Sequence, residues 1–171
     1  VRKQFADTAL WVGALTTAKD GTAEVALEMP ENLTTWRIKV WGMGHGTKVG
    51  QGETEVVTAK DFIIRLQAPR FLVETDEVVL SAIVHNYHRE SKKAQVSLEL
   101  DGKTLKPLPN TAMTQAATVE PDGAERIDWR VQAVKEGQAE IIMKAVTTGD
   151  ADAMKLTIPV YVHGMLKTES F

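Results

Sequence analysis

Hydrophobic and polar residues alternate along most of the chain. One example is the set Ala23, Val25, Leu27 and Met29, which is interleaved with Glu24, Ala26 and Glu28. Similar alternation covers residues 36–40, 62–68, 78–84, 96–100, 127–133, 139–145 and 156–162. Successive side chains of a strand point to opposite faces of its sheet, so each stretch predicts a strand with one buried face. No segment keeps a helical period, and we expect almost no helix.

Turn residues separate these stretches. Asp20-Gly21, Asp101-Gly102 and Asp122-Gly123 are each flanked by alternating segments, and Asp-Gly is a strong signal for a β-hairpin. Short alternating strands that are broken by turns are typical of antiparallel sandwiches. We therefore predict an all-β protein built as a tandem antiparallel β-sandwich with immunoglobulin- or fibronectin-III-like architecture.

The predicted strands divide unevenly. Residues 62–163 supply about seven strands, which is enough for a complete sandwich. Residues 1–61 supply only about four, over 8–16, 22–29, 35–43 and 53–60, and a sheet needs a second layer to cover its apolar face. We therefore expect the first unit to be the second half of a domain, with a boundary near residues 60–62. The chain begins with Val1 and ends with Phe171, and we expect it to be a piece of a longer protein.

Composition excludes several classes of function. The 171 residues are 43% hydrophobic and 25% charged, which is ordinary for a globular protein. The formal net charge of −3 lacks the basic excess of a nucleic-acid-binding protein. Since the chain has no cysteine, it contains no disulfide, thiol nucleophile or Cys-ligated metal.

Two motifs invite a ligand-binding interpretation that their spacing does not support. The glycine-rich stretch from Gly42 to Gly46 is followed by Thr47-Lys48, which breaks the spacing of a phosphate-binding loop, and strand patterns flank it. We therefore interpret it as a flexible connection. His85 and His88 are three residues apart, so in a strand they would face opposite sides and could not share a metal. We predict no metal site and no cofactor.

Hydrolytic chemistry has no clear sequence support. None of the four serines lies in the Gly-x-Ser-x-Gly motif of a serine hydrolase. The four acidic residues considered for general acid or base catalysis fall at predicted strand ends or on solvent-facing positions. They are Asp61, Asp76, Asp128 and Glu140. We predict no catalytic residues and no enzymatic activity.

Asn32 and the tryptophans have structural alternatives to binding roles. Asn32-Leu33-Thr34 fits the N-glycosylation sequon, but Asn32 follows Pro30-Glu31 and is better interpreted as a turn residue. The tryptophans could form a platform on which sugars stack. Trp36 shares a strand face with Ile38 and Val40 and is expected in a core or between domains, whereas Trp41 lies on the other face and is the plausible exposed tryptophan.

Four segments together resemble the alpha-2-macroglobulin family. These are Phe5-Ala6-Asp7-Thr8-Ala9-Leu10-Trp11, then Pro30-Glu31-Asn32-Leu33-Thr34-Thr35-Trp36-Arg37, then Phe62-Ile63-Ile64-Arg65-Leu66 with Pro69-Arg70-Phe71-Leu72 and Asp76, and finally Val84-His85-Asn86-Tyr87. They follow one another in the order of the family's segments. Because the sequence has no cysteine, it resembles the bacterial branch of that family.

The resemblance implies a division into macroglobulin-like domains. Residues 1–61 would be the second half of such a domain, downstream of the protease-sensitive bait insertion, and residues 62–163 a complete one. Residues 164–171 would begin a CUB-like domain. Neither a bait segment nor the Cys-Gly-Glu-Gln thioester motif occurs in this sequence.

The implied function is that of a scaffold in a broad-spectrum endopeptidase inhibitor that traps proteases. The implied partners are the upstream half-domain, the CUB-like and thioester domains, and the target endopeptidases. Self-association through the incomplete first unit is a further expectation. The implied location is extracytoplasmic and periplasmic, with the parent protein anchored by lipid to the inner membrane. Two alternatives stay open: a tandem β-sandwich binding module of an adhesin or carbohydrate-active protein, and an accessory domain of a hydrolase.

Overall fold

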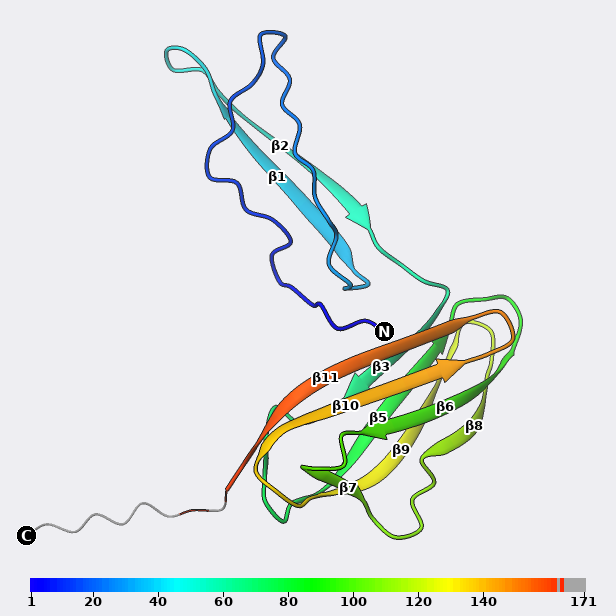
Figure 1. The fold of residues 1–171 in the computed structure, drawn as a ribbon. Helices are drawn as coiled ribbons and strands as arrows, with labels where there is room; N and C mark the ends of the chain where they lie inside the picture. The colour runs from blue at the N-terminus through cyan, green and yellow to red at the C-terminus, as the bar shows by residue number, and fades with distance from the viewer. Residues whose placement is uncertain (163, 165–171) are drawn as a thin grey trace, which may run out of the picture. The chain divides into compact units, whose positions relative to one another are not determined.

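The computed structural model describes residues 1–162 and residue 164, and these form strands, turns and irregular segments without any helix (Figure 1). In this part of the chain there is accordingly no helix long and apolar enough to cross a membrane. The expectation that residues 164–171 begin a CUB-like domain concerns a stretch that, apart from Gly164, lies outside the described residues. The chain divides into two compact units. One comprises Val1–Lys3 together with the chain from Asp61 onward, and the other comprises Gln4–Lys60.

The larger unit is a two-layer β-sandwich. One sheet has the strand order β4-β11-β10-β6-β8, and the other has the order β3-β5-β9-β7. Their bounds are β3 Phe62–Gln67, β4 Leu72–Val73, β5 Glu77–Asn86, β6 Lys92–Leu100, β7 Leu105–Pro107, β8 Thr114–Val119, β9 Gly123–Ala133, β10 Gly137–Val146 and β11 Ala151–Tyr161. All pairings are antiparallel except that of β4 with β11. The predicted all-β sandwich class is thus confirmed.

The sandwich core is formed by the inward positions of the alternating segments. Trp129 on β9 is buried, and its indole N–H donates a hydrogen bond of 2.9 Å to the carbonyl oxygen of Ala112. The other large, fully buried apolar side chains are Ile64, Leu80, Val84, Val96, Leu105, Val119, Val131, Ile141 and Met143. One cluster of this size supplies the burial that stabilises a domain.

The smaller unit contains a two-stranded antiparallel hairpin, β1 (Thr35–Met43) and β2 (Val49–Val57), which is drawn in light blue and cyan in Figure 1. Residues 8–16 and 22–29 form no strand, so the prediction of strands there is wrong. Alternation describes side-chain direction in an extended segment, but a strand also needs a neighbour to complete its hydrogen-bond ladder. The fourth predicted strand, over residues 53–60, exists but begins four residues earlier as β2.

A short polar segment closes the smaller unit. Glu31 and Gln4 are joined by hydrogen bonds in both directions, with the Gln4 amide donating to Oε2 of Glu31 over 2.7 Å. The Oδ1 atom of Asn32 accepts a hydrogen bond of 2.9 Å from the Ala6 amide, and the Asn32 carbonyl accepts one of 2.7 Å from the Thr58 hydroxyl. Asn32 therefore ties the beginning of the unit to its end through contacts between distant residues. It lies in no turn, so its interpretation as a turn residue is wrong.

Candidate functional site

The two histidines considered for metal binding lie in different environments. The ring of His85 on β5 stacks on Tyr87, with centroids 6.0 Å apart and planes inclined by 5°. Burial, and secondarily the charge of Arg65, lowers the pKa of His85. His88 lies in the following loop, where its Nε2 atom is 3.3 Å from Oδ2 of Asp150. Among residues 1–162 and 164, no three His, Asp or Glu side chains are grouped as metal ligands.

Asn86 holds the loop that carries His88. Its side chain is fully buried, and its amide nitrogen donates to the carbonyl oxygens of Glu90 at 2.8 Å and Val119 at 3.0 Å. Its amide oxygen accepts a hydrogen bond of 3.1 Å from the His88 backbone N–H. A buried amide with partners on both ends fixes the path of the backbone around it. The presence of Asn86 in the sequence motif at the end of β5 is therefore explained by its role in holding this loop.

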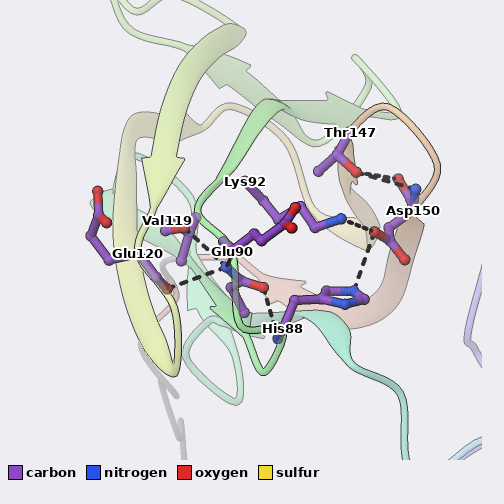
Figure 2. Close-up of polar contacts among 8 residues, drawn as sticks. His88, Glu90, Lys92, Val119, Glu120, Thr147 and Asp150 are labelled. Carbon is purple, nitrogen blue, oxygen red and sulfur yellow. Dashed lines mark hydrogen bonds and ion pairs between the residues drawn. The ribbon is translucent and has the colours of Figure 1, made fainter.

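Charged side chains from two loops and from the start of β6 meet at this end of the sandwich (Figure 2). Nζ of Lys92 lies 3.1 Å from Oδ2 of Asp150, and His88 approaches the same carboxylate oxygen. Thr147 and Asp150 close the turn between β10 and β11 by backbone and side-chain hydrogen bonds of 2.8–3.2 Å. The hydrogen bond from Lys92 is the main cause that lowers the pKa of Asp150, and the charge of His88 adds to it.

The lowered pKa of Asp150 predicts a local pH dependence. A carboxyl group with a depressed folded-state pKa contributes stability above its unfolded value, about 3.9, and loses that contribution as the pH falls through the folded value. Substituting Lys92→Met should therefore move the titration midpoint of Asp150 upward, toward its ordinary value. Carboxyl chemical shifts measured by NMR between pH 2 and 6 would report this. Lys39→Met, on the other unit, serves as the control, and an unchanged Asp150 midpoint in Lys92→Met would contradict the assignment.

The candidate acids and serines form surface pairs and turns. The Ser81 hydroxyl donates a hydrogen bond of 2.7 Å to Oδ1 of Asp128, and Arg126 contacts the same oxygen at 2.8 Å. These contacts, with that of Ser81 the largest, lower the pKa of Asp128. A lowered pKa makes this carboxylate a weak base for activating a nucleophile, a role that histidine ordinarily fills.

Of the other three acids, Asp76 and Glu140 have partners for their carboxylates, and Asp61 is exposed. The Asp76 carboxylate accepts a hydrogen bond of 2.8 Å from the Val73 amide and closes a turn. Glu140 lies 2.8 Å from Lys155 on the neighbouring strand, and the Asp61 carbonyl accepts a hydrogen bond of 2.7 Å from the Tyr87 amide. The structure does not bring these acids together as a paired-carboxylate site.

The hairpin of the smaller unit has two chemically different faces. One face pairs Arg37 with Glu53 and Glu55, at distances of 3.0 and 3.2 Å, and adds Lys39 beside Glu53. The register places Trp36 opposite Val56 on the other face, together with Ile38 and Val40. Ile38 and Val40 are 39% and 59% exposed, and only Trp36 is half-buried. Among the described residues of the smaller unit, this face therefore does not form a closed core. The alternative, that Trp36 packs between domains, stays a prediction.

The glycine-rich stretch forms the tip of this hairpin, between β1 and β2. The Gly44 amide donates a hydrogen bond of 2.8 Å to the Lys48 carbonyl, and Gly46 has a φ of +77°, which glycine adopts readily. Strands on both sides, rather than a following helix, exclude the geometry of a phosphate-binding loop. Trp41 is 61% exposed on the charged face near this tip.

Sequence reasoning missed one buried charge. The side chain of Asp152 is 1% exposed and pairs with Arg2 at 2.7 Å. The alternation of β11, taken backward from Val160, Ile158 and Leu156, places residue 152 on the inward face, and a carboxylate at such a position requires a buried partner. That signal was present in the sequence, although nothing in it names Arg2 as the partner.

A family model and a curated relative both identify the family of this chain. The model of the "Alpha-2-macroglobulin family" matches residues 8–98, which is more than half of the chain. An alpha-2-macroglobulin of Thermotoga maritima is 31% identical over 162 residues, covering 94% of this chain and 10% of that protein. The chain thus spans about a tenth of the length of this curated relative.

Solved structures show the same fold. Escherichia coli alpha-2-macroglobulin activated by porcine elastase aligns with a TM-score of 0.72 at 21% identity, covering 86% of this chain and 14% of the other. Salmonella alpha-2-macroglobulin reacted with methylamine aligns with a TM-score of 0.65 at 24% identity, covering 85% and 10% respectively. At these identities the likeness concerns the fold alone.

Proposed function

Because this chain belongs to the alpha-2-macroglobulin family, we propose that it is a scaffold region of a larger, broad-spectrum endopeptidase inhibitor that traps proteases. In this proposal residues 62–163 are a complete macroglobulin-like sandwich, and residues 1–61 are the second half of such a domain, downstream of the bait insertion. Residues 164–171 lead into a CUB-like domain. The parent protein is extracytoplasmic, and the neighbouring domains and target endopeptidases are its partners.

The incompletely covered apolar face of the β1–β2 hairpin is the observation that carries the scaffold role. Ile38 and Val40 on this face are exposed, while the neighbouring sandwich completes its own core. A sheet with one apolar face is stable when a second layer covers that face. The upstream half of the same domain would be this layer, so the hairpin would join the bait-bearing part of the parent protein to the sandwich.

The chemistry of the described residues also favours a scaffold over an enzyme. Their polar clusters are turn contacts and surface pairs, and an inhibitor that works by physical trapping needs rigid domains rather than a nucleophile. The alternative of a sugar-binding module would need coplanar exposed rings. Tyr87 instead stacks on His85, and the Phe71 and Tyr161 rings are inclined by 53°.

Protease trapping by the full-length parent protein tests the proposal. A trap blocks cleavage of a large protein substrate while the captured protease still cleaves a small peptide substrate. We expect Trp36→Ala in the parent protein to weaken trapping severalfold, because it removes the largest side chain of the apolar face. Trp41→Ala, on the opposite face, is the matched control. Wild-type trapping by the Trp36→Ala protein, or protease inhibition by the 171-residue chain alone, would contradict the scaffold role.

A further inference from the structure

Residues Val1–Lys3 belong to the sandwich and extend its edge, whereas the residues that follow, Gln4–Lys60, form the other unit. The Arg2 amide donates a hydrogen bond of 2.7 Å to the Ala153 carbonyl, and the Lys155 amide donates one of 2.9 Å to the Arg2 carbonyl. These contacts form a parallel bridge between Arg2 and Met154 on β11. An extended segment that adds to an exposed strand edge in this way is the geometry of peptide binding by β-augmentation.

The side chain of Arg2 enters the gap between the two sheets. Its guanidinium contacts Asp152 through Nε at 3.1 Å and Nη2 at 2.7 Å, and Nη2 also donates a hydrogen bond of 2.7 Å to the Ile64 carbonyl. The Asp152 carboxylate accepts a further hydrogen bond of 3.0 Å from the Ile64 amide. Arg2 and Asp152 together therefore occupy both backbone groups of Ile64 at the free edge of β3.

This recess is selective for arginine. The planar guanidinium presents several N–H donors in fixed directions and can serve a carboxylate and a carbonyl at once, whereas lysine is a compact point charge. The two side chains are 13% and 1% exposed, so the contact is largely removed from water. If the arginine left this recess, the Asp152 carboxylate would be a buried charge without its partner, which is energetically costly.

We propose that the recess around Asp152 is a docking site for an extended, arginine-bearing segment, filled in this chain by Val1–Lys3. Docking shields the Arg2–Lys3 peptide bond from trypsin-like proteases. Such a protease binds the arginine side chain in its own pocket and pairs with the backbone of an extended segment. In docked Arg2 the guanidinium and both backbone groups are already hydrogen-bonded to the sandwich. Cleavage then requires local opening of the segment. On the proposed function, the site anchors the chain just downstream of the bait insertion, but the docking itself does not depend on that function.

Limited trypsin digestion followed by mass spectrometry tests the proposal. The chain is prepared with a Gly/Ser extension free of Lys and Arg before Val1, so that the bond is not terminal. We expect cleavage after residue 2 to be at least about ten times slower than in a free peptide of the same local sequence. Arg2→Lys keeps a trypsin site but loses the planar set of N–H donors. Its cleavage rate, divided by that of the matching lysine peptide, should therefore be severalfold higher than the same ratio for the wild-type chain. Arg37→Lys, in an exposed pair of the other unit, should leave the rate unchanged.

Amide hydrogen exchange separates undocking from unfolding. In Arg2→Lys the Lys155 amide, which donates to the Arg2 carbonyl, should exchange severalfold faster, while the Met143 amide in the core strand β10 should not change. If the wild-type bond is cut as fast as in the free peptide, or if Arg2→Lys alters neither cleavage nor Lys155 exchange, the docking site does not exist. If the amides of Lys155 and Met143 both exchange faster in Arg2→Lys, Arg2 stabilises the whole sandwich, and the proposal of selective docking is overturned.

Discussion

Replacing Arg2 with alanine is expected to lower the free energy of unfolding of the sandwich by about 3–5 kcal/mol, because it leaves the buried Asp152 carboxylate without its charged partner. Asp152 lies within β11, whose neighbours hold it in place, and it cannot move into water without breaking the sheet. The converse substitution should cost less. In Asp152→Ala, Arg2 can swing into solvent with its short segment, and the cost, about 1–3 kcal/mol, is chiefly the unsatisfied Ile64 amide.

A double-mutant cycle of these two positions makes the asymmetry measurable. Urea unfolding followed by circular dichroism should give a cost for the double alanine variant that falls short of the sum of the single costs by about 1–3 kcal/mol. Arg126→Ala and Asp128→Ala provide the control, because that pair is 59% and 48% exposed and should be worth less than about 1 kcal/mol. Equal costs for Arg2→Ala and Arg126→Ala would show that burial does not strengthen the Arg2 contact.

Alternation in the sequence predicted strands such as β9 and β10, in which one face is buried. In β9, Ile127, Trp129 and Val131 are buried while the residues between them face solvent or the sheet surface, and the same holds for β10. Strand β8 was missed because Gln115, Ala116 and Ala117 are too small or polar to produce a hydrophobic pattern. This strand is held by its ladder to β6, which side-chain alternation does not report.

Contacts between distant residues could not be predicted at all. Arg2 and Asp152 are separated by nearly the whole chain, and their pairing depends on the way the edge of β11 meets β3. Asn86 shows the opposite case. It stood in a motif that the sequence singled out, but its role required the positions of the Glu90 and Val119 carbonyls. The sequence can indicate that a polar residue faces inward, whereas the partner is determined by topology.

The two units are expected to differ greatly in stability. Amides near Ile127–Val131 and Ile141–Met143 lie in central strands over a closed core, whereas β1 and β2 pair only with each other in the described part of the chain. An isolated two-stranded hairpin is at best marginally stable in water. In the monomeric chain, amides near Val25 and Ile38 should therefore exchange at least about a hundredfold faster than those of β9 and β10.

Self-association would change this pattern in a way that concentration reveals. Exposed apolar faces and sheet edges favour pairing between chains, so protection of the Ile38 amide that rises with protein concentration would indicate a second copy on the hairpin face. Exchange should therefore be measured at several concentrations, with Met143 as the internal reference. Protection of Ile38 equal to that of Met143 in a dilute monomer would mean that residues 4–60 close their own core. The hairpin would then not be half of a domain, and the physical argument for the scaffold role would fail.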